Sequence, residues 1–205
     1  MINISKIFTI GHSNQSIDSY LSILELNKIN CIVDIRSRPY SKYVNQFNKE
    51  NLEKFLRNKH IKYIFMGKEL GAKRNEKILY AKEGYLDFDK FSNTQIFISG
   101  IQRIKIGIEK GYRIAIMCTE KEPLDCHRTL LIARILYKEG YEVLNILENG
   151  EIKTQDCIEK ELLDIHYPNR MQQDFFNNFQ ENNSNLIEEA YKLQNRKKGF
   201  KLENK

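Results

Sequence analysis

The most constraining feature of this sequence is the alternation of short apolar runs with longer amphipathic segments. The runs are rich in β-branched and aromatic residues and predict strands over residues 6–10, 31–35, 61–66, 112–118 and 141–147. Apolar residues at helical spacing predict helices over 16–29, 48–59, 88–111 (one helix or two), 126–139 and 154–166. Such alternation is typical of a parallel sheet covered on both faces. We therefore predict a three-layer α/β fold with a mostly parallel, five-stranded sheet and helices on both faces.

The chain has 205 residues, enough for one domain with a sizeable core. We place that domain at residues 1–166. The remaining residues, 167–205, are rich in Asn and Gln and end in a basic stretch. We interpret them as a C-terminal extension that need not belong to the core, although 186–194 could be helical.

Hydropathy and cysteine content bear on the location of the protein. No run approaches the roughly 18 apolar residues of a membrane helix, and the first residues do not resemble a signal peptide. We therefore expect a cytoplasmic protein without a membrane partner. Because disulfides are rare in that compartment, we do not expect the four cysteines to form a disulfide framework.

The net charge of +6 and the isoelectric point near 9.0 permit a polyanionic partner without requiring one. An anionic small molecule or a nucleic acid would both suit this charge. Many lysines lie on expected helix surfaces, where solvation alone explains them. The sequence does not indicate an oligomeric state.

Polar and reactive residues follow four of the predicted strands. In parallel α/β sheets the carboxyl ends of the strands meet at one edge, and ligands bind there. The segments in question are "GHSN" (11–14), "DIRSRP" (34–39), "LGAKR" (70–74) and "CTEKEPLDCHR" (118–128). Their convergence predicts a ligand-binding crevice at this edge.

Cys126 is the first candidate for a reactive group in the crevice. Asp125 is a suitable N-cap, so we expect Cys126 and His127 in the first turn of a helix. Helix amides and the charge of Arg128 would stabilise a Cys126 thiolate. The alternative is a small buried residue that joins helix to sheet. Cys118, at a strand end, is more typical of a buried residue on the crevice floor, with a resolving cysteine as the other possibility. Cys31 and Cys157 are interpreted as packing residues.

A metal site would need ligands at suitable spacing. Cys118, Cys126 and His127, with Glu120 or His12, could supply a tetrahedral set. Seven residues separate the two cysteines, however, and no paired C-x2-C motif is present. We therefore expect neither a metal nor a cofactor.

Arginines after the second strand suggest an anion clamp. Arg36 and Arg38 alternate along an extended segment and can face the same way. Lys73, Arg74 and Arg128 would support them. A salt bridge from Asp34 to Arg36 or Arg38 is the alternative, and both arrangements can hold at once. His12, at the end of the first strand, is a candidate general acid or base.

Several of these segments carry a family resemblance. "TIGHSN", "VDIRSRPYS", "FNKENLEKFL", "IKYIFMGKELG" and "IAIMCTEKEPLDCHRTLLIARIL" together resemble the prokaryotic family called domain of unknown function 488, from about Phe8 to about Leu163. The resemblance implies a compact α/β domain and a suspected enzyme of unassigned reaction. The family pattern carries over to Gly11, His12, Ser13, Asn14, Asp34, Arg36, Pro39, Leu70, Gly71, Cys118, Glu120, Pro123, Cys126, His127 and Arg128.

The chain departs from the family pattern at three positions. Ala72 stands where members often have a second glycine, and Asn145 and Gln155 stand where they often have histidine. Any chemistry or metal binding that depends on those histidines would be absent here, which further weakens the metal hypothesis.

Two main functions and one structural alternative remain open. The leading hypothesis is an enzyme with Cys126 as nucleophile, His12 or His127 as acid or base, and Glu120 in support. Its anionic substrate, such as a nucleotide or a modified base in nucleic acid, would be bound by Ser13, Asn14, Asp34, Arg36, Arg38 and Arg128. The rival is a non-catalytic nucleic-acid-binding module that uses the same arginines. The third is a buried ion network of Glu120, Arg128 and Asp34 that only fixes the loops.

Overall fold

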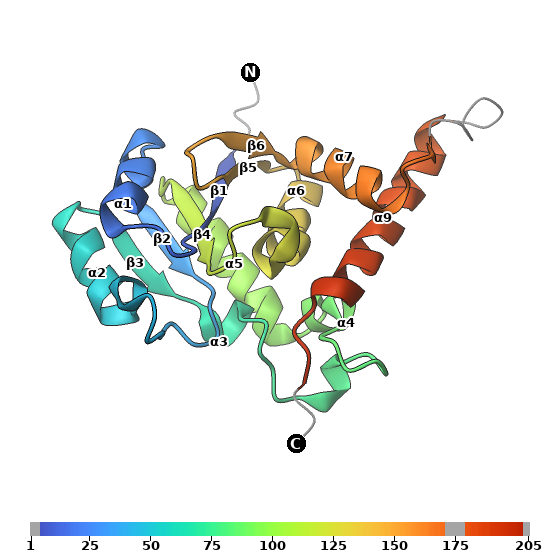
Figure 1. Ribbon diagram of the computed structural model, residues 1–205, viewed down its shortest axis with the longest axis horizontal. Coiled ribbons are helices and arrows are strands. Elements are labelled where there is room, and N and C mark those ends of the chain that lie inside the picture. Colours follow the sequence, from blue (N-terminus) through green and yellow to red (C-terminus); the bar gives the residue numbers. More distant parts are fainter. Residues whose placement is uncertain (1–4, 171–178, 203–205) are drawn as a thin grey trace.

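The computed structural model describes residues 5–170 and 179–202 and contains one six-stranded sheet (Figure 1). Its strands are β1 (Lys6–Gly11), β2 (Cys31–Asp34), β3 (Lys62–Phe65), β4 (Ile114–Cys118), β5 (Glu142–Ile146) and β6 (Ile152–Thr154), in the spatial order β3-β2-β4-β1-β5-β6. All neighbouring pairs are parallel except β5 and β6. The predicted mostly parallel α/β fold is confirmed, with a sixth strand added. β6 gave no signal because its residues, IKT, are few and not buried.

The helices follow the predicted alternation. They are α1 (Ile17–Leu26), α2 (Lys49–Asn58), α3 (Gly67–Leu70), α4 (Phe88–Ser92), α5 (Gln95–Glu109), α6 (Arg134–Lys138), α7 (Gln155–His166) and α9 (Phe179–Lys198). Short 3₁₀ turns are η1 (Asn45–Phe47), η2 (Lys77–Leu79) and η3 (Pro123–Asp125), and the π-helical segment η4 (Arg128–Ala133) runs into α6. The segment 88–111 forms two helices, α4 and α5. The second begins after Thr94, whose hydroxyl oxygen accepts a hydrogen bond from the Phe97 amide and so caps α5.

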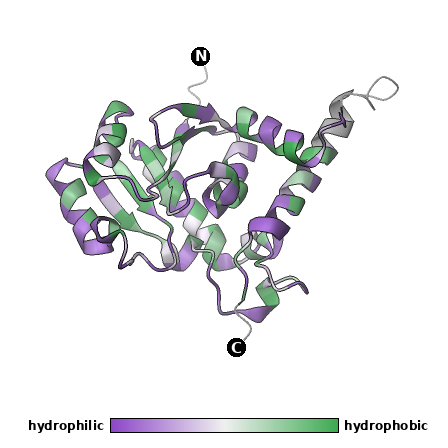
Figure 2. Cartoon of the chain, viewed as in Figure 1, coloured by the Kyte–Doolittle hydropathy of each residue, from purple (hydrophilic) through white to green (hydrophobic). Residues whose placement is uncertain are grey.

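Helices cover both faces of the sheet (Figure 1), and the central strands are coloured mostly as hydrophobic in Figure 2. One buried cluster joins strand residues such as Phe8 and Ile32 to Leu24 of α1 and Leu52 of α2. The other joins Ile7, Val33 and Ile116 to α5 and the η4–α6 helix. Successive strand residues point to opposite faces, so both faces of a central strand must be apolar.

The neighbouring strands β1 and β4 send the chain to opposite faces of the sheet. β1 leads to α1 in one layer, and β4 leads to η4 in the other. Gly11 at the end of β1 lies beside Cys118 at the end of β4. A crevice forms where two adjacent parallel strands diverge in this way, and it is the usual ligand site of open α/β sheets.

The described part of the C-terminal segment packs against the domain. Ala190 and Tyr191 of α9 are 0% and 1% exposed. The Gln194 side chain donates to the Leu124 carbonyl, and Asn195 accepts from the Phe88 amide. The helix expected over 186–194 is thus part of α9, while the domain boundary near residue 166 stays a prediction. No helix in the described ranges is long and apolar enough to cross a membrane.

Candidate functional site

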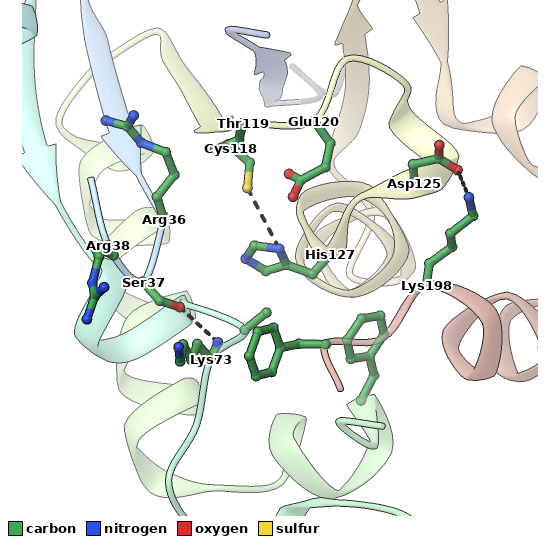
Figure 3. A pocket seen from close by; sticks show the side chains of 13 residues that line it. Arg36, Ser37, Arg38, Lys73, Cys118, Thr119, Glu120, Asp125, His127 and Lys198 are labelled. Atoms are coloured by element: carbon green, nitrogen blue, oxygen red, sulfur yellow. Dashed lines mark hydrogen bonds and ion pairs between the residues drawn. The ribbon is translucent and has the colours of Figure 1, made fainter. Parts of the chain in front are cut away.

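A pocket of about 290 Å³ opens at the carboxyl edge of the sheet (Figure 3). Its wall is formed by the loops that follow β2, α3 and β4, together with the end of α9 and the residues after it. The lining residues are Arg36, Ser37, Arg38, Ala72, Lys73, Phe88, Cys118, Thr119, Glu120, Asp125, His127, Lys198 and Phe200. Three of the four segments expected to converge therefore do meet at this pocket.

The loop after β4 is fixed against the end of β1. The Ser13 amide donates to the Thr119 carbonyl at 2.9 Å, which extends the β1–β4 pairing beyond both strands. The Arg128 guanidinium is fully buried and donates to the carbonyls of Glu120, at 2.5 Å, and Lys121, at 3.0 Å. Arg128 therefore positions the loop and does not line the pocket.

The helix after this loop begins later than predicted. Pro123–Asp125 forms a 3₁₀ turn, and Cys126 is extended, with φ −130° and ψ 137°. The helical backbone starts at His127, so the expected first-turn position of Cys126 is wrong. The Cys126 sulfur nevertheless lies over the helix start, 3.4 Å from the Arg128 amide nitrogen that donates to it.

Four side chains form a compact group at the pocket floor, which we call the thiol cluster: Cys118, Glu120, Cys126 and His127. The Sγ atoms of Cys118 and Cys126 lie 3.8 and 3.9 Å from Nδ1 of His127. Glu120 Oε2 lies 3.0 Å from the Cys126 sulfur. In Figure 3 the Cys118 sulfur and the Glu120 carboxylate both point toward the His127 ring. Cys118, Glu120 and His127 line the pocket, whereas Cys126 is 1% exposed and lies behind them.

The cluster shifts the acidity of its members in opposite directions. Burial raises the pKa of Cys118 well above its ordinary value. For Cys126, burial and the charge of Glu120 are outweighed by hydrogen bonds from Cys118 and His127 and by the charge of Arg128, so its pKa falls to about 6. Burial opposes the charged form of His127, but Cys126 and Glu120 raise its pKa. The pair of thiols thus loses its first proton easily and holds the second one tightly.

The same cluster could hold a metal ion. Cys118 Sγ, Cys126 Sγ and a His127 ring nitrogen all lie within 4.8 Å of one another. Cysteine thiolates and imidazole are the preferred ligands of Zn²⁺.

Asp34, Arg36 and His12 form a second, fully bonded group beside the pocket. Asp34 is 0% exposed and accepts three hydrogen bonds from Arg36, at 2.6 to 3.0 Å, and one from the Tyr63 hydroxyl, at 2.6 Å. Arg36 also donates to the Phe47 carbonyl and contacts Nε2 of His12 at 3.0 Å. The alternative salt bridge of Asp34 is therefore formed, and it occupies the Arg36 guanidinium.

His12 is held by contacts to both ring nitrogens. Its Nδ1 lies 2.8 Å from the Ser13 carbonyl oxygen, and its ring stacks on Phe47 at 4.3 Å. Burial and the charge of Arg36 lower the pKa of His12 to about 4. The ring is therefore neutral at pH 7, with Nδ1–H donating to Ser13 and Nε2 accepting from Arg36. His12, Ser13 and Asn14 do not line the pocket.

Three of the five predicted cations line the pocket. Arg36 does so with its guanidinium bonded to Asp34, whereas Arg38 and Lys73 are exposed. Arg74 instead pairs with Glu76 at 3.1 Å. Lys198, at the end of α9, and Phe200 were missed, because nothing in the sequence links residues near the C-terminus to this crevice. Lys198 pairs with Asp125 at 2.9 Å, and Lys73 Nζ lies 5.5 Å from the centre of the Phe200 ring.

The third alternative, an ion network of Glu120, Arg128 and Asp34, is not formed among the described residues. Arg128 binds backbone carbonyls rather than the Glu120 carboxylate, and Asp34 pairs with Arg36. The loops are fixed by Arg128 through main-chain contacts.

Comparison with known proteins agrees with the family resemblance of the motifs. No curated protein and no solved structure matches this chain. The family described as "Domain of unknown function DUF488" matches residues 16–135, which is more than half of the 205 residues. The protein belongs to this family, whose activity is unassigned.

Proposed function

We propose that the protein is a cytoplasmic enzyme that binds an anionic substrate in the pocket and acts on it with the thiol cluster. The observation that carries this proposal is the position of the cluster: three of its four side chains form part of a pocket whose rim bears Arg38, Lys73 and Lys198. Reactive groups and anion-binding groups thus face the same space of about 290 Å³. This volume is close to the lower end of the range for small-molecule pockets, roughly 300 Å³, which suits a ligand of the size of a nucleotide.

The rim has cationic groups available for a ligand. In the ranges that the structure describes, neither Arg38 nor Lys73 forms an ion pair, and both are exposed. Lys198 pairs with the exposed Asp125, and an exposed pair of this kind contributes little stability, so an incoming anion can replace the carboxylate. Charge-assisted hydrogen bonds from such groups suit phosphate oxygens.

The aromatic wall favours a nucleotide over a simple inorganic anion. Phe88 and Phe200 both line the pocket, and Phe200 is half-buried with Lys73 above its ring. An aromatic ring beside cationic side chains can stack a base while the cations contact its phosphate.

The composition of the thiol cluster favours catalysis over binding alone. Anion binding does not need two thiols, a carboxylate and a buried imidazole at the floor of the same pocket. Clusters of titratable groups with shifted pKa values are more common at catalytic sites than elsewhere. The nucleophile role of Cys126 stays a prediction, since its sulfur has partners but is 1% exposed. His12 is assigned a positioning role through Arg36.

The nucleic-acid-binding alternative is less well supported. Of the arginines it would use, Arg36 is 6% exposed and Arg128 is 0% exposed, and both are bonded within the protein. Only Arg38 is free to reach a phosphate backbone. Binding of an oligonucleotide that falls steeply with salt and needs no cluster residue would favour this alternative.

Calorimetric titration with a panel of nucleoside mono-, di- and triphosphates tests the binding step. We expect the double variant Arg38→Ala/Lys73→Ala to bind at least about 10-fold more weakly than wild type, from the loss of charge-assisted contacts. The control is Lys54→Ala/Arg57→Ala, which removes the same charge from the exposed face of α2. Equal weakening in both variants, or no binding by wild type, would overturn the proposal.

Turnover of the bound nucleotides tests the catalytic step. Products are followed by chromatography and mass spectrometry. We expect Cys126→Ser and Glu120→Gln to abolish product formation while binding persists. Wild type that binds nucleotides tightly but converts none of them would be a binding module.

A further inference from the structure

We propose that the thiol cluster is a binding site for Zn²⁺, held by Cys118 Sγ, Cys126 Sγ and His127 Nδ1. The three atoms come from the end of β4 and from the start of the helix that packs beside it. This inference deepens the proposed function by placing a metal ion at the pocket floor. Anion binding by Arg38 and Lys73 does not depend on it.

The spacing of the ligand atoms suits a tetrahedral ion. With Zn–S near 2.3 Å and Zn–N near 2.0 Å, the sulfur–nitrogen edge of a tetrahedron is roughly 3.5 Å. The corresponding distances are 3.8 Å for Cys118 and 3.9 Å for Cys126, both to Nδ1. Side-chain shifts of a few tenths of an ångström would bring each sulfur to this distance from Nδ1. The two sulfurs lie within 4.8 Å of each other, where the sulfur–sulfur edge of the same tetrahedron is roughly 3.8 Å.

The hydrogen-bonding state of His127 is a second, independent observation. Its side chain is 9% exposed, and Nε2 is buried without a partner. The contacts of Nδ1 are to the two sulfurs, which are weak hydrogen-bond partners. A buried imidazole without an oxygen partner needs an explanation, and an ion is one of the usual ones. Zn²⁺ on Nδ1 would replace these two weak contacts with a metal bond.

The fourth coordination position would face the pocket. Cys118 and His127 line the pocket, and Glu120 lies between it and Cys126. Three protein ligands with one open position are typical of catalytic zinc, whereas structural zinc has four protein ligands. Glu120 is placed to accept a hydrogen bond from a water on the ion, because its Oε2 lies 3.0 Å from one of the ligand atoms.

The separation of the two cysteines in the sequence does not keep them apart in the folded chain. The seven residues between the cysteines form a loop that Arg128 holds at Glu120 and Lys121, so both sulfurs reach the same nitrogen. The family histidines replaced by Asn145 and Gln155 are not required either. Asn145 bonds to Thr9 and Gln155 in a separate buried network.

Titration of the metal-free protein with Co²⁺ tests the site. Tetrahedral Co²⁺–thiolate sites show sulfur-to-metal charge-transfer absorption and strong visible bands. Zn²⁺ displaces the Co²⁺, and both absorptions then disappear. We expect one equivalent to bind to wild type, and the charge-transfer band to be lost in Cys118→Ser and Cys126→Ser. The variants Cys31→Ser and Cys157→Ser are matched controls that should keep the band, because these thiols lie outside the cluster.

X-ray absorption on zinc-loaded wild type gives a readout that needs no variant. We expect two sulfur neighbours and one imidazole nitrogen in the first shell. A first shell of only nitrogen and oxygen, or a wild type that gives no thiolate band, would overturn the zinc site.

Failure of the zinc site is distinguishable from failure of the proposed function. A zinc-bound Cys126 cannot attack a substrate, so a metal-free cluster with nucleotide turnover would leave Cys126 as the nucleophile. Loss of nucleotide binding in Arg38→Ala/Lys73→Ala would persist in either case.

Discussion

The carbonyl oxygen of Glu120 lies 1.9 Å from the position that a β-carbon on Gly11 would occupy. This contact joins the "GHSN" segment to the loop that carries the thiol cluster. We predict that Gly11→Ala displaces the loop after β4 and lowers the free energy of unfolding by about 1 to 3 kcal/mol. Urea denaturation followed by circular dichroism measures this.

The control for this prediction is Gly107→Ala in α5. A β-carbon there approaches only the end of the Ile114 side chain, at 2.8 Å, and alanine favours a helix over glycine by roughly 1 kcal/mol. We expect its stability to be unchanged or higher. Equal stability of Gly11→Ala and wild type would show that the loop does not need this close approach.

The buried His12 predicts an acid-sensitive fold. Its pKa falls from 6.5 in the unfolded chain to about 4 in the folded one, so the unfolded state binds more protons between these values. Stability is therefore fully present above pH 6.5 and is lost as the pH falls toward 4, by roughly 3 kcal/mol. The change in unfolding free energy over this window should be smaller in His12→Gln. The same slope in both proteins would place the titration elsewhere.

Arg36 and Arg38 predict opposite phenotypes although they are two residues apart. Arg36→Ala leaves Asp34 buried without its cation, which costs about 3 to 5 kcal/mol of stability. Arg38→Ala changes an exposed residue and should alter stability by no more than about 0.5 kcal/mol. Its effect should be on nucleotide affinity. Thermal unfolding and calorimetric titration of both variants check this, and a loss of stability in Arg38→Ala alone would contradict the assignment.

The last turn of α9 and the residue pair that follows it should contribute to ligand binding. Lys198→Ala and Phe200→Ala remove side chains from the pocket wall, so we expect each to weaken nucleotide binding severalfold. Lys197→Ala is the matched control, since Lys197 is exposed and does not line the pocket. If all three variants bind like wild type, the end of the chain is not part of the site.

The sequence predicted the elements and the edge of the sheet that carries the site. Apolar runs such as "IAIM" and the strand-end rule depend only on local pattern and on parallel pairing. They placed Arg38, Cys118, Glu120 and His127 near one crevice, and the pocket includes all four.

The remaining differences came from long-range packing, which local pattern does not encode. For Arg36 the sequence left both a ligand clamp and a salt bridge to Asp34 open, and the fold forms the salt bridge at a position that still lines the pocket. Arg128 lowers the pKa of Cys126 through its charge, as expected, but its guanidinium donates to the carbonyls of the preceding loop and not to a ligand. Lys198 and Phe200 join the pocket only because α9 packs against Leu124 and Phe88, which lie 70 and 107 residues before the α9 residues that bind them.

The most direct measurement is a high-resolution crystal structure of the protein soaked with a nucleoside monophosphate. The account predicts a phosphate within hydrogen-bond distance of Arg38 and Lys73, a base against Phe200, and the ligand above Cys118 and His127. A nucleotide bound outside this pocket, or a pocket that stays unliganded at saturating concentration, would contradict it.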